Sequence, residues 1–260
     1  MEGIKMKPAP GDSQQLESRG NGHLPDLSSP GFIVPEKIVY THTRQVAIAP
    51  TRWEERRVIA AYEDGPLVEP YKILRTQVML RMRENGWNLL GITSAGPSEG
   101  KTLTAANLAV SLAMDVRQTV LLVDANLRDP GVHELFGIGE NPGLADHLLD
   151  HKPVKDLLVH PGLPRLVILP AGRVVRGSSE LLTSPPMLSL ISEFKHRYPS
   201  RIILFDLPPL LPTDDTLAIS PYLDALLFVV EAGQTQVEEV EKSLRLLRGV
   251  PVLGTVLNKG

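Results

Sequence analysis

The sequence predicts an α/β protein with a doubly wound, mostly parallel sheet, and the order and composition of its apolar segments lead to this class. After residue 86, short apolar segments alternate with amphipathic segments of helical period. Most of the short segments are continuously apolar, which is typical of strands buried on both faces of a parallel sheet. The strands are expected at Trp87–Thr93, Thr119–Val123, Leu166–Leu169, Ile202–Phe205, Ala225–Val230 and Val252–Leu257. The helices between them are expected at Thr102–Arg117, Leu144–Asp150, Met187–Arg197 and Val237–Leu247.

The chain divides into an N-terminal segment and one folded domain. Residues 1–55 are expected to be flexible or partly ordered, because the first half of this segment carries too little apolar surface to offset the entropy of ordering. The β-branched runs within Phe32–Ala49 are either edge strands or a linker, and the sequence leaves both open. Residues 56–260 are predicted to form the domain, with a helix at Pro70–Glu84 and a nucleotide-binding core over about 86–260.

Composition excludes several classes of protein. The 260 residues are 42% hydrophobic, enough for a sizeable core, and they include no cysteine. Disulfide scaffolds, thiolate metal sites, iron–sulfur clusters and cysteine nucleophiles are therefore excluded. The formal net charge of −3 supplies no overall field for nucleic acid, so no nucleic-acid partner is expected. No segment has the length of a membrane span or the pattern of a secretory signal, so the chain is expected in the cytoplasm.

The loop between the first predicted strand and the next helix has the composition of a phosphate-binding loop. The free N–H groups at the start of a helix, at the positive end of its dipole, favour a bound phosphate. Lys101 would reach the β- and γ-phosphates, and the Thr102 hydroxyl would ligate Mg²⁺. The strict pattern has glycine where this chain has Ala95, so the alternative is a turn that happens to end in Gly-Lys-Thr. The residues expected to contact the nucleotide here are Gly96, Pro97, Ser98, Glu99, Gly100, Lys101, Thr102 and Leu103.

Two predicted strands lead into an aspartate at the same edge of the sheet. Asp124 follows Val120–Val123, and Asp206 follows Ile202–Phe205. Because the carboxyl ends of parallel strands face one crevice, both carboxylates would stand beside the phosphate loop, where Mg²⁺ is held. The predicted metal ligands are therefore Thr102, Asp124 and Asp206. For each aspartate the alternative is a carboxylate that only begins a turn.

Three further side chains complete the predicted nucleotide site. Asn126 and Arg128 follow Asp124 on the same crevice and are assigned to nucleotide binding with it. Asn258 stands just past the last strand, where the donor and acceptor of its amide would suit the edge of adenine. A turn asparagine near the end of the chain is the alternative for Asn258.

Together these motifs resemble those of the bacterial tyrosine kinases of the polysaccharide-export type. That family is built on a P-loop NTPase fold related to the septum-site and plasmid-partition ATPases, which are MinD-like and ParA-like. The partition-type relatives carry a signature lysine that would fall at Gly96, and the iron–sulfur relatives need cysteines that this chain lacks. The likeness runs from about Pro66 to Asn258 and includes the stretches Asn141–Leu148, Leu169–Gly172 and Glu180–Ser184.

The resemblance implies ATP and Mg²⁺ as cofactors, with Lys101, Asp124 and Asp206 as catalytic residues and a tyrosine of another copy as acceptor. It implies a transmembrane polysaccharide co-polymerase, a chain-length regulator, as the activating partner that would hold the chain peripherally at the inner membrane. It also implies homo-oligomers formed through the first helix. There Glu69, Lys72 and Arg75 occupy a Glu-x-x-Arg-x-x-Arg spacing in which lysine has replaced the middle arginine. A solvated charged face is the alternative for these three residues.

Two departures from the family pattern bear on activity. Asn126 stands where the family usually has aspartate, and an amide can neither supply charge to Mg²⁺ nor act as a base. The sequence ends without the tyrosine-rich tail of many relatives, and of its five tyrosines Tyr40 and Tyr62 are the expected acceptors, the others being expected in the core. The leading hypothesis is a protein-tyrosine autokinase that regulates polysaccharide polymerisation and export. The two departures favour the alternative hypothesis, an ATP-binding switch without efficient kinase activity. A third hypothesis is a partition-like ATPase.

Overall fold

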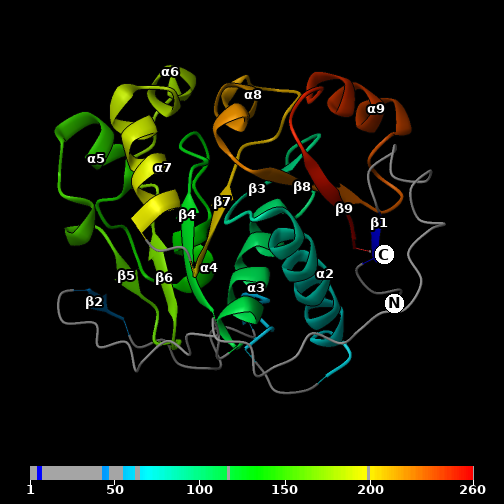
Figure 1. Ribbon diagram of the computed structural model, residues 1–260, viewed down its shortest axis with the longest axis horizontal. Helices are drawn as coiled ribbons and strands as arrows, with labels where there is room; N and C mark the ends of the chain where they lie inside the picture. The colour runs from blue at the N-terminus through cyan, green and yellow to red at the C-terminus, as the bar shows by residue number, and fades with distance from the viewer. Residues whose placement is uncertain are drawn as a thin grey trace.

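One sheet organises the molecule. The computed structural model describes residues 5–7, 43–46, 55–61, 65–115, 118–197 and 200–259. Within them the sheet has nine strands in the order β1-β9-β8-β3-β7-β4-β6-β5-β2, and helices cover both of its faces (Figure 1). The strands are β1 Lys5–Lys7, β2 Arg44–Gln45, β3 Leu89–Ser94, β4 Thr119–Asp124, β5 Val159–His160, β6 Leu166–Leu169, β7 Arg201–Asp206, β8 Ala225–Glu231 and β9 Val252–Asn258.

The central strands are parallel to one another, which confirms the predicted fold class. All pairings from β9 through β8, β3, β7 and β4 to β6 are parallel. At the margins β1 pairs antiparallel with β9 and β5 pairs antiparallel with β6, while β2 runs parallel to β5. The chain adds strands on one side of β3 and later on the other, so the crevice at the carboxyl ends of β3, β7 and β4 is where such folds bind ligands.

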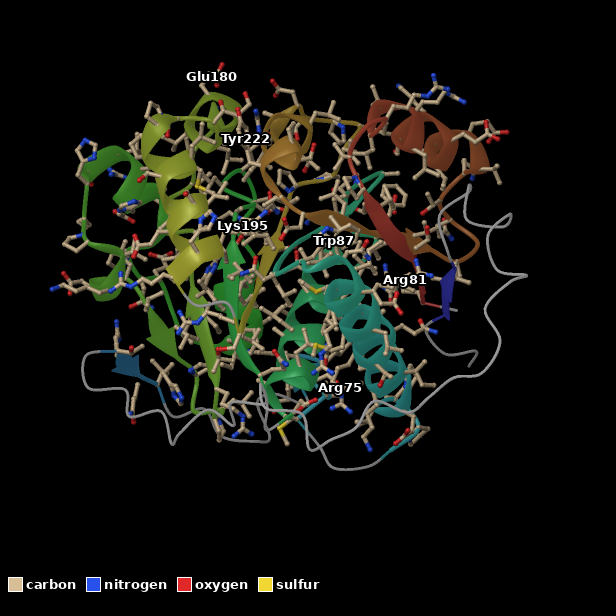
Figure 2. All side chains as sticks on the ribbon, in the orientation of Figure 1. Arg75, Arg81, Trp87, Glu180, Lys195 and Tyr222 are labelled. Carbon is tan, nitrogen blue, oxygen red and sulfur yellow. The ribbon has the colours of Figure 1, made fainter. Side chains whose placement is uncertain are left out.

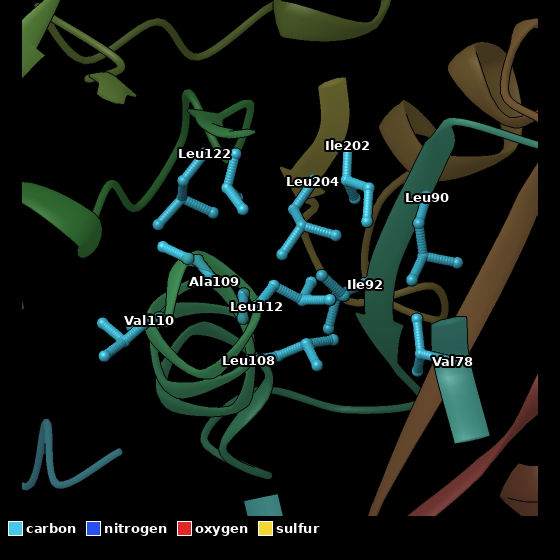
Figure 3. Packing of buried hydrophobic residues seen from close by; sticks show 14 of the residues in the cluster. Val78, Leu90, Ile92, Leu108, Ala109, Val110, Leu112, Leu122, Ile202 and Leu204 are labelled. Carbon is cyan, nitrogen blue, oxygen red and sulfur yellow. The ribbon is translucent and has the colours of Figure 1, made fainter. Parts of the chain in front are cut away.

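Two helices cover one face of the sheet. The main contacts come from α3, whose Leu108 and Leu112 pack on Leu90 and Ile92 of β3, with Val78 of α2 beside them (Figure 3). The other face carries α7, together with α5 and α8. The helices are α2 Glu69–Asn85, α3 Lys101–Ala113, α4 Val132–Phe136, α5 Leu144–Asp150, α6 Ser178–Leu182, α7 Pro185–Arg197, α8 Asp215–Ile219 and α9 Val237–Leu246, with short 3-10 turns η2 Val154–Asp156 and η3 Ser220–Tyr222.

Alternate residues of a strand enter the two cores. Leu89 lies in the cluster beneath α7, whereas Leu90 and Ile92 lie in the cluster beneath α2 and α3. This alternation follows from the two-residue period of a strand, and because both faces are covered most positions are apolar. Continuous apolar runs were therefore the correct signal for the central strands.

The predicted elements lie close to their predicted bounds, and several short elements were not predicted. Strand β6 and helix α5 have their predicted bounds, whereas the helix predicted to reach Arg117 ends at Ala113. Its last turn closes through the Asp115 N–H, which donates to the Leu112 carbonyl. Helices α4, α6 and α8 have five residues each, too few to show a helical period in the sequence.

Part of the N-terminal segment joins the sheet. Lys5–Lys7 pair with Leu257, Val256 and Thr255 of β9, so these three residues of the N-terminal segment are ordered in the sheet. Arg44–Gln45 form an edge strand against β5, which is one of the two alternatives left open for that region. Most of the remainder of residues 1–55 lies outside the residues that the structure describes.

Candidate nucleotide-binding site

The predicted phosphate loop connects β3 to α3. The loop runs from the end of β3 at Ser94 to Gly100, the N-cap of α3. Gly100 has a φ of 91°, a left-handed conformation that glycine adopts without steric cost. No side chain caps this helix end, so its first amides remain available to an anion. The loop therefore has the form of a phosphate cradle, with Lys101 and Thr102 in the first turn of the helix.

The buried side chain of Glu99 stabilises the loop by accepting a hydrogen bond from its backbone. Its Oε1 accepts a hydrogen bond of 2.7 Å from the Gly96 N–H, and the side chain is 6% exposed. Burial raises the pKa of Glu99, and the hydrogen bond from Gly96 acts in the opposite direction. Because the carboxylate is turned into the protein, only the backbone of Glu99 is placed to meet a phosphate. The sequence assigned this residue to nucleotide contact without showing that its side chain points inward.

Lys101 is the cation of the site. Its side chain is largely buried, at 8% exposed, and its Nζ lies 3.3 Å from Thr102 Oγ1. Burial raises the pKa of both nearby carboxyls, Asp124 and Asp206, and the positive charge of Lys101 offsets part of that rise. A buried ammonium group between a helix N-terminus and two carboxylates suits the binding of a phosphate chain that brings its own Mg²⁺.

Asp124 and Asp206 are partners in the register of β4 and β7, which confirms that the two strands bring them together. Both side chains are fully buried. Asp124 accepts hydrogen bonds from the backbone N–H groups of Asn126, at 3.2 Å, and Val132, at 3.1 Å. Burial raises its pKa well above the usual value, and the negative charge of Asp206 raises it further. A raised pKa makes this carboxylate a better proton acceptor.

The Asp206 side chain, unlike that of Asp124, accepts no hydrogen bonds from backbone N–H groups in the described part of the chain. Neither of its carboxylate oxygens forms a hydrogen bond of normal geometry among the described residues, although the side chain is completely buried and the Thr102 hydroxyl lies near enough to lower its pKa. Burial raises its pKa to about 6. Buried polar groups are nearly always satisfied, so the bare oxygens indicate a missing ligand.

A magnesium ion fits this set of donors. Two carboxylates and the Thr102 hydroxyl are all oxygen ligands, which Mg²⁺ prefers. In the described part of the chain, no group of three or more histidine, aspartate or glutamate side chains is placed to hold a metal ion by itself. The small number of protein ligands also fits, because Mg²⁺ commonly keeps several waters and takes substrate phosphates as further ligands.

Asn126 holds the loop that follows β4. Its Nδ2 donates a hydrogen bond of 2.5 Å to the Asp129 carbonyl, and the side chain is 1% exposed. Its Oδ1 has no partner among the described residues. An aspartate in this place could not donate to Asp129, so the amide has a structural role that an aspartate could not fill.

Arg128 is directed away from the predicted nucleotide contact. Its Nε donates to Asp215 Oδ2 at 2.6 Å, and Asp215 also accepts a hydrogen bond from Ser178 Oγ. The network joins the loop after β4 to α8 and α6. In this structure Arg128 therefore makes a contact between elements, and its assignment to the nucleotide stays a prediction.

The structure shows a contact of Asn258 that the sequence did not predict, and the adenine contact stays a prediction. The Asn258 Nδ2 donates to the Glu99 carbonyl at 2.9 Å, and the residue is 8% exposed at the end of β9. The amide thus contacts the phosphate loop itself. No sequence pattern could have shown this contact, because 159 positions separate the two residues.

A cavity of about 900 Å³ opens at the cradle. Its lining includes the loop, the start of α3, and α4 with Gly139 and Glu140. Arg56 completes the lining from a segment before α2. The volume lies within the range of ligand sites and is sufficient for a nucleotide together with a further group.

The segment that carries Arg56 is tied to α3 by one buried side chain. Asn107 Oδ1 accepts hydrogen bonds from the N–H groups of Ile59, at 2.8 Å, and Ala60, at 3.0 Å. Its Nδ2 donates to the Arg57 carbonyl at 2.9 Å. We call residues 55–61 the strap. Asn107 therefore fixes the strap on the helix that begins at the phosphate loop, and no local sequence pattern indicates this contact.

The three charged residues of α2 do not form one free surface. Lys72 Nζ contacts Glu69 Oε1 at 2.8 Å. Arg75 Nη1 donates to the Ser111 carbonyl of α3 at 3.1 Å, so its guanidinium is turned toward the neighbouring helix. Figure 2 shows Arg75 and Arg81 on α2. Ile73 and Leu80, in contrast, are more than half exposed, at 54% and 55%.

The fold and the site together define a P-loop NTPase, with the loop after β3 and two aspartates at the ends of neighbouring parallel strands. No protein-family model matches the chain. The tyrosine-protein kinase YwqD of Bacillus subtilis is 33% identical over 207 residues, which are 78% of this chain and 86% of that protein. The chain belongs to this family of bacterial tyrosine-protein kinases.

Other relatives are longer. The tyrosine-protein kinase etk of Escherichia coli K12 is 31% identical over 193 residues, which are 74% of this chain but 26% of that protein. The chain thus spans about a quarter of the length of such curated relatives.

Solved structures agree with the family. The kinase domain of the Escherichia coli tyrosine kinase ETK has a TM-score of 0.72 at 28% identity and covers 85% of this chain and 88% of its own. The chimerical protein CapA2B2 has a TM-score of 0.73 at 26% identity, over 84% of this chain and 93% of its own. The septum site-determining protein MinD of Pyrococcus horikoshii, at 24% identity, a TM-score of 0.52 and 64% of this chain and 68% of its own, shares the fold alone.

Proposed function

We propose that the chain is an ATP-dependent protein-tyrosine autokinase that regulates the polymerisation and export of an exopolysaccharide. Membership of the tyrosine-kinase family supports the reaction. The observation that carries the proposal is the pair of fully buried aspartates beside Lys101, one with its oxygens bonded to backbone amides and the other with bare oxygens. This difference gives the two carboxylates different tasks.

The residues that would hold ATP and Mg²⁺ are the loop amides, Lys101, Thr102 and Asp206. When bound, Mg²⁺ would neutralise charge on the phosphates of the nucleotide. Loop amides and Lys101 are fixed before the nucleotide arrives, so they cost little reorganisation during the reaction. Asp206 is the ligand whose free oxygens need a cation.

Asp124 is the proposed base. The phenol of the acceptor tyrosine loses its proton to Asp124, and its oxygen forms a bond to the γ-phosphorus while the bond to the β-phosphate oxygen breaks, so that ADP leaves. An unperturbed phenol has a pKa of about 10, so the proton needs an acceptor in the site. The raised pKa of Asp124 favours this transfer.

The far end of the cavity is the proposed entrance for the acceptor. It extends from Lys101 toward α4 and Arg56. Of the predicted acceptors, Tyr40 and Tyr62 lie outside the described residues. Tyr71 is buried in the core, as predicted, and burial raises its pKa to about 12. Tyr222 is 44% exposed, so the expectation of a core position is wrong for this residue (Figure 2).

The proposal includes a membrane partner. Among the described residues, no helix has the length and apolar composition to cross a membrane. A transmembrane polysaccharide co-polymerase would bring the chain to the inner membrane from the cytoplasm and activate it. This partner comes from the family resemblance, as do homo-oligomers formed through α2.

Two variants separate the proposed tasks of the aspartates. The full chain, first treated with a phosphatase, is incubated with Mg-ATP and its phosphotyrosine is measured by mass spectrometry. Asp124→Asn should slow the reaction by about a hundredfold or more at any magnesium concentration, because a positioned base contributes at least this much. Asp206→Asn should instead shift the magnesium dependence to higher concentration. Asp129→Asn, an exposed carboxylate of the same cavity, is the matched control and should retain activity.

Full activity of Asp124→Asn would show that Asp124 is not the base. Absence of phosphotyrosine in the wild-type chain, with ATP binding intact, would replace the kinase by the nucleotide switch. Thermal melts of each variant without nucleotide show that the fold is retained.

A further inference from the structure

The end of the sheet contacts the phosphate loop at two consecutive carbonyl groups. Asn258 Nδ2 donates to the Glu99 carbonyl at 2.9 Å. Lys259 Nζ donates to the Ser98 carbonyl, also at 2.9 Å. Both donors come from the last residues of β9 and its exit, so one short segment holds two neighbouring peptide groups of the loop.

The contact with Asn258 is close enough to exclude any side chain at the next loop position. A Cβ at Gly100 would lie 1.9 Å from Asn258 Nδ2, which is far inside van der Waals contact. Gly100 also has its φ of 91°, so glycine is required there for two independent reasons. The loop and the amide are therefore fitted to each other.

Lys259 is itself held in place. Its Nζ forms an ion pair of 2.9 Å with Glu231 Oε2, at the end of the neighbouring strand β8. The Lys259 side chain is 44% exposed, so this pair adds little stability by itself. Its consequence is geometric, because it aims the ammonium group at the Ser98 carbonyl. We call Asn258, Lys259 and Glu231 the clamp.

Holding these carbonyls fixes the direction of two N–H groups. In a trans peptide the C=O and the following N–H point in opposite directions. With the Ser98 and Glu99 carbonyls turned toward β9, the N–H groups of Glu99 and Gly100 are turned away from β9. The cavity is lined by Ser98 and Gly100 of this loop and does not include Asn258.

We propose that Asn258 and Lys259 are positioning residues that orient the Glu99 and Gly100 amides for the phosphates of the nucleotide. In this role Asn258 acts on the phosphate chain through the loop and does not contact the adenine base. The inference rests on the proposed binding of ATP. It differs from the adenine contact predicted from the sequence. In the proposed role, loss of the Asn258 amide weakens binding of the phosphate chain, whereas an adenine contact would make the same loss weaken binding of the base.

Inorganic tripolyphosphate separates the two roles, because it has the phosphate chain without the base. Binding of Mg-ATP and of Mg-tripolyphosphate to the full chain is measured by calorimetry. Asn258→Ala should weaken both ligands by the same factor, about tenfold, as expected for one hydrogen bond of ~1.4 kcal/mol in a buried site. A loss for ATP with unchanged tripolyphosphate binding would overturn the proposal and assign Asn258 to the base.

Lys259 provides a second test on a partly exposed residue whose replacement does not threaten the fold. Lys259→Met should weaken both ligands about two- to threefold, and Lys259→Arg, which can still donate to Ser98, should restore binding. Arg81→Met is the matched control, because Arg81 Nη1 donates at 2.6 Å to the Leu253 carbonyl, elsewhere on β9. It should lower stability and leave tripolyphosphate binding unchanged.

The outcomes distinguish this inference from the function on which it rests. If the wild-type chain binds neither ligand, the proposed nucleotide binding is wrong and the clamp has no such role. If the wild type binds both and neither Asn258→Ala nor Lys259→Met weakens tripolyphosphate, only the clamp proposal is wrong. If Asn258→Ala does not fold, the Lys259 variants decide the question alone.

Discussion

Two aspartates in register on neighbouring strands have distinct surroundings, and this difference determines what each can do. Asp124 is bonded to two backbone amides, whereas the Asp206 carboxylate forms no hydrogen bond of normal geometry among the described residues and has the Thr102 hydroxyl as its neighbour. Burial raises the pKa of both. Without a cation the site therefore contains a destabilising cluster of negative charge, which Lys101 offsets only in part.

The pH dependence of stability follows from Asp206. Its pKa rises on folding from an ordinary 3.8 to about 6, so the folded state binds more protons than the unfolded state between these values. The free energy of unfolding should therefore fall as pH rises through this window, by roughly 3 kcal/mol for this group. Asp206→Asn mimics the protonated form, and it should match the wild type near pH 4 and be more stable at pH 7.5.

Urea unfolding of both proteins without magnesium or nucleotide measures the difference at each pH. Subtracting the free energy of unfolding of the wild type from that of Asp206→Asn at each pH removes the contributions of the other carboxylates. A gap between wild type and Asp206→Asn that does not change with pH would show that Asp206 titrates normally in the folded protein.

Asn126 gives a second prediction at the scale of one residue. Asn126→Asp removes the donor to the Asp129 carbonyl and adds a third carboxylate to the cluster. The free energy of unfolding without magnesium should fall by at least about 2 kcal/mol, and by more than for Asn126→Ala, which removes the donor without adding charge. Added Mg²⁺ should narrow the gap between the two variants. Equal losses in both, with or without magnesium, would contradict the charge argument.

At the scale of elements, the strap shows how one side chain organises the entrance to the site. Asn107 accepts from two strap amides and donates to a strap carbonyl, while Val58 of the strap is completely buried. The strap in turn brings Arg56 to the cavity. The position of a cavity residue thus depends on a buried asparagine on α3.

Asn107→Ala should lower the free energy of unfolding by about 3 kcal/mol, because it leaves buried backbone groups of the strap without partners. Ser111→Ala, a buried polar change on the same helix, is the matched control and should cost about 1 kcal/mol or less. Hydrogen exchange at Ile59 and Ala60 should accelerate in the first variant alone. Unchanged exchange at these amides would show that the strap is held by other contacts.

Elements were predictable where their pattern is long and local. The continuous apolar runs predicted the central strands. Because parallel topology follows from the order of elements, the aspartates at the ends of two of these strands were predicted to lie side by side, as Asp124 and Asp206 do. The inward turn of Glu99 and the contact of Asn258 with the loop were not predictable. Both depend on side-chain directions or on pairs of residues far apart in the sequence, which local patterns do not contain.

At the scale of the whole molecule, the outer face of α2 is the proposed oligomer contact. Ile73 and Leu80 are exposed there, one above the other on the helix at a spacing of seven residues. Arg75 is turned toward α3, so the apolar side chains are better placed than the charged triplet to bury area between copies.

Ile73→Asp with Leu80→Asp should therefore reduce the mass of the assembly measured by light scattering, since each introduces a charge into a buried contact. Leu246→Asp, at an exposed apolar position of α9, is the control and should leave the mass unchanged. A wild-type chain that is monomeric at every concentration tested, with Mg-ATP present, would contradict the proposed contact.

The measurement that tests the central claim most directly is phosphotyrosine on the full chain after incubation with Mg-ATP. The wild type, first stripped of phosphate, should gain phosphotyrosine, and Lys101→Met should gain none, because the buried ammonium that holds the phosphates is gone. Lys242→Met, an exposed lysine of α9, should behave as the wild type. Phosphotyrosine formed by Lys101→Met at the wild-type rate would contradict the assignment of this loop as the phosphate site of a tyrosine kinase.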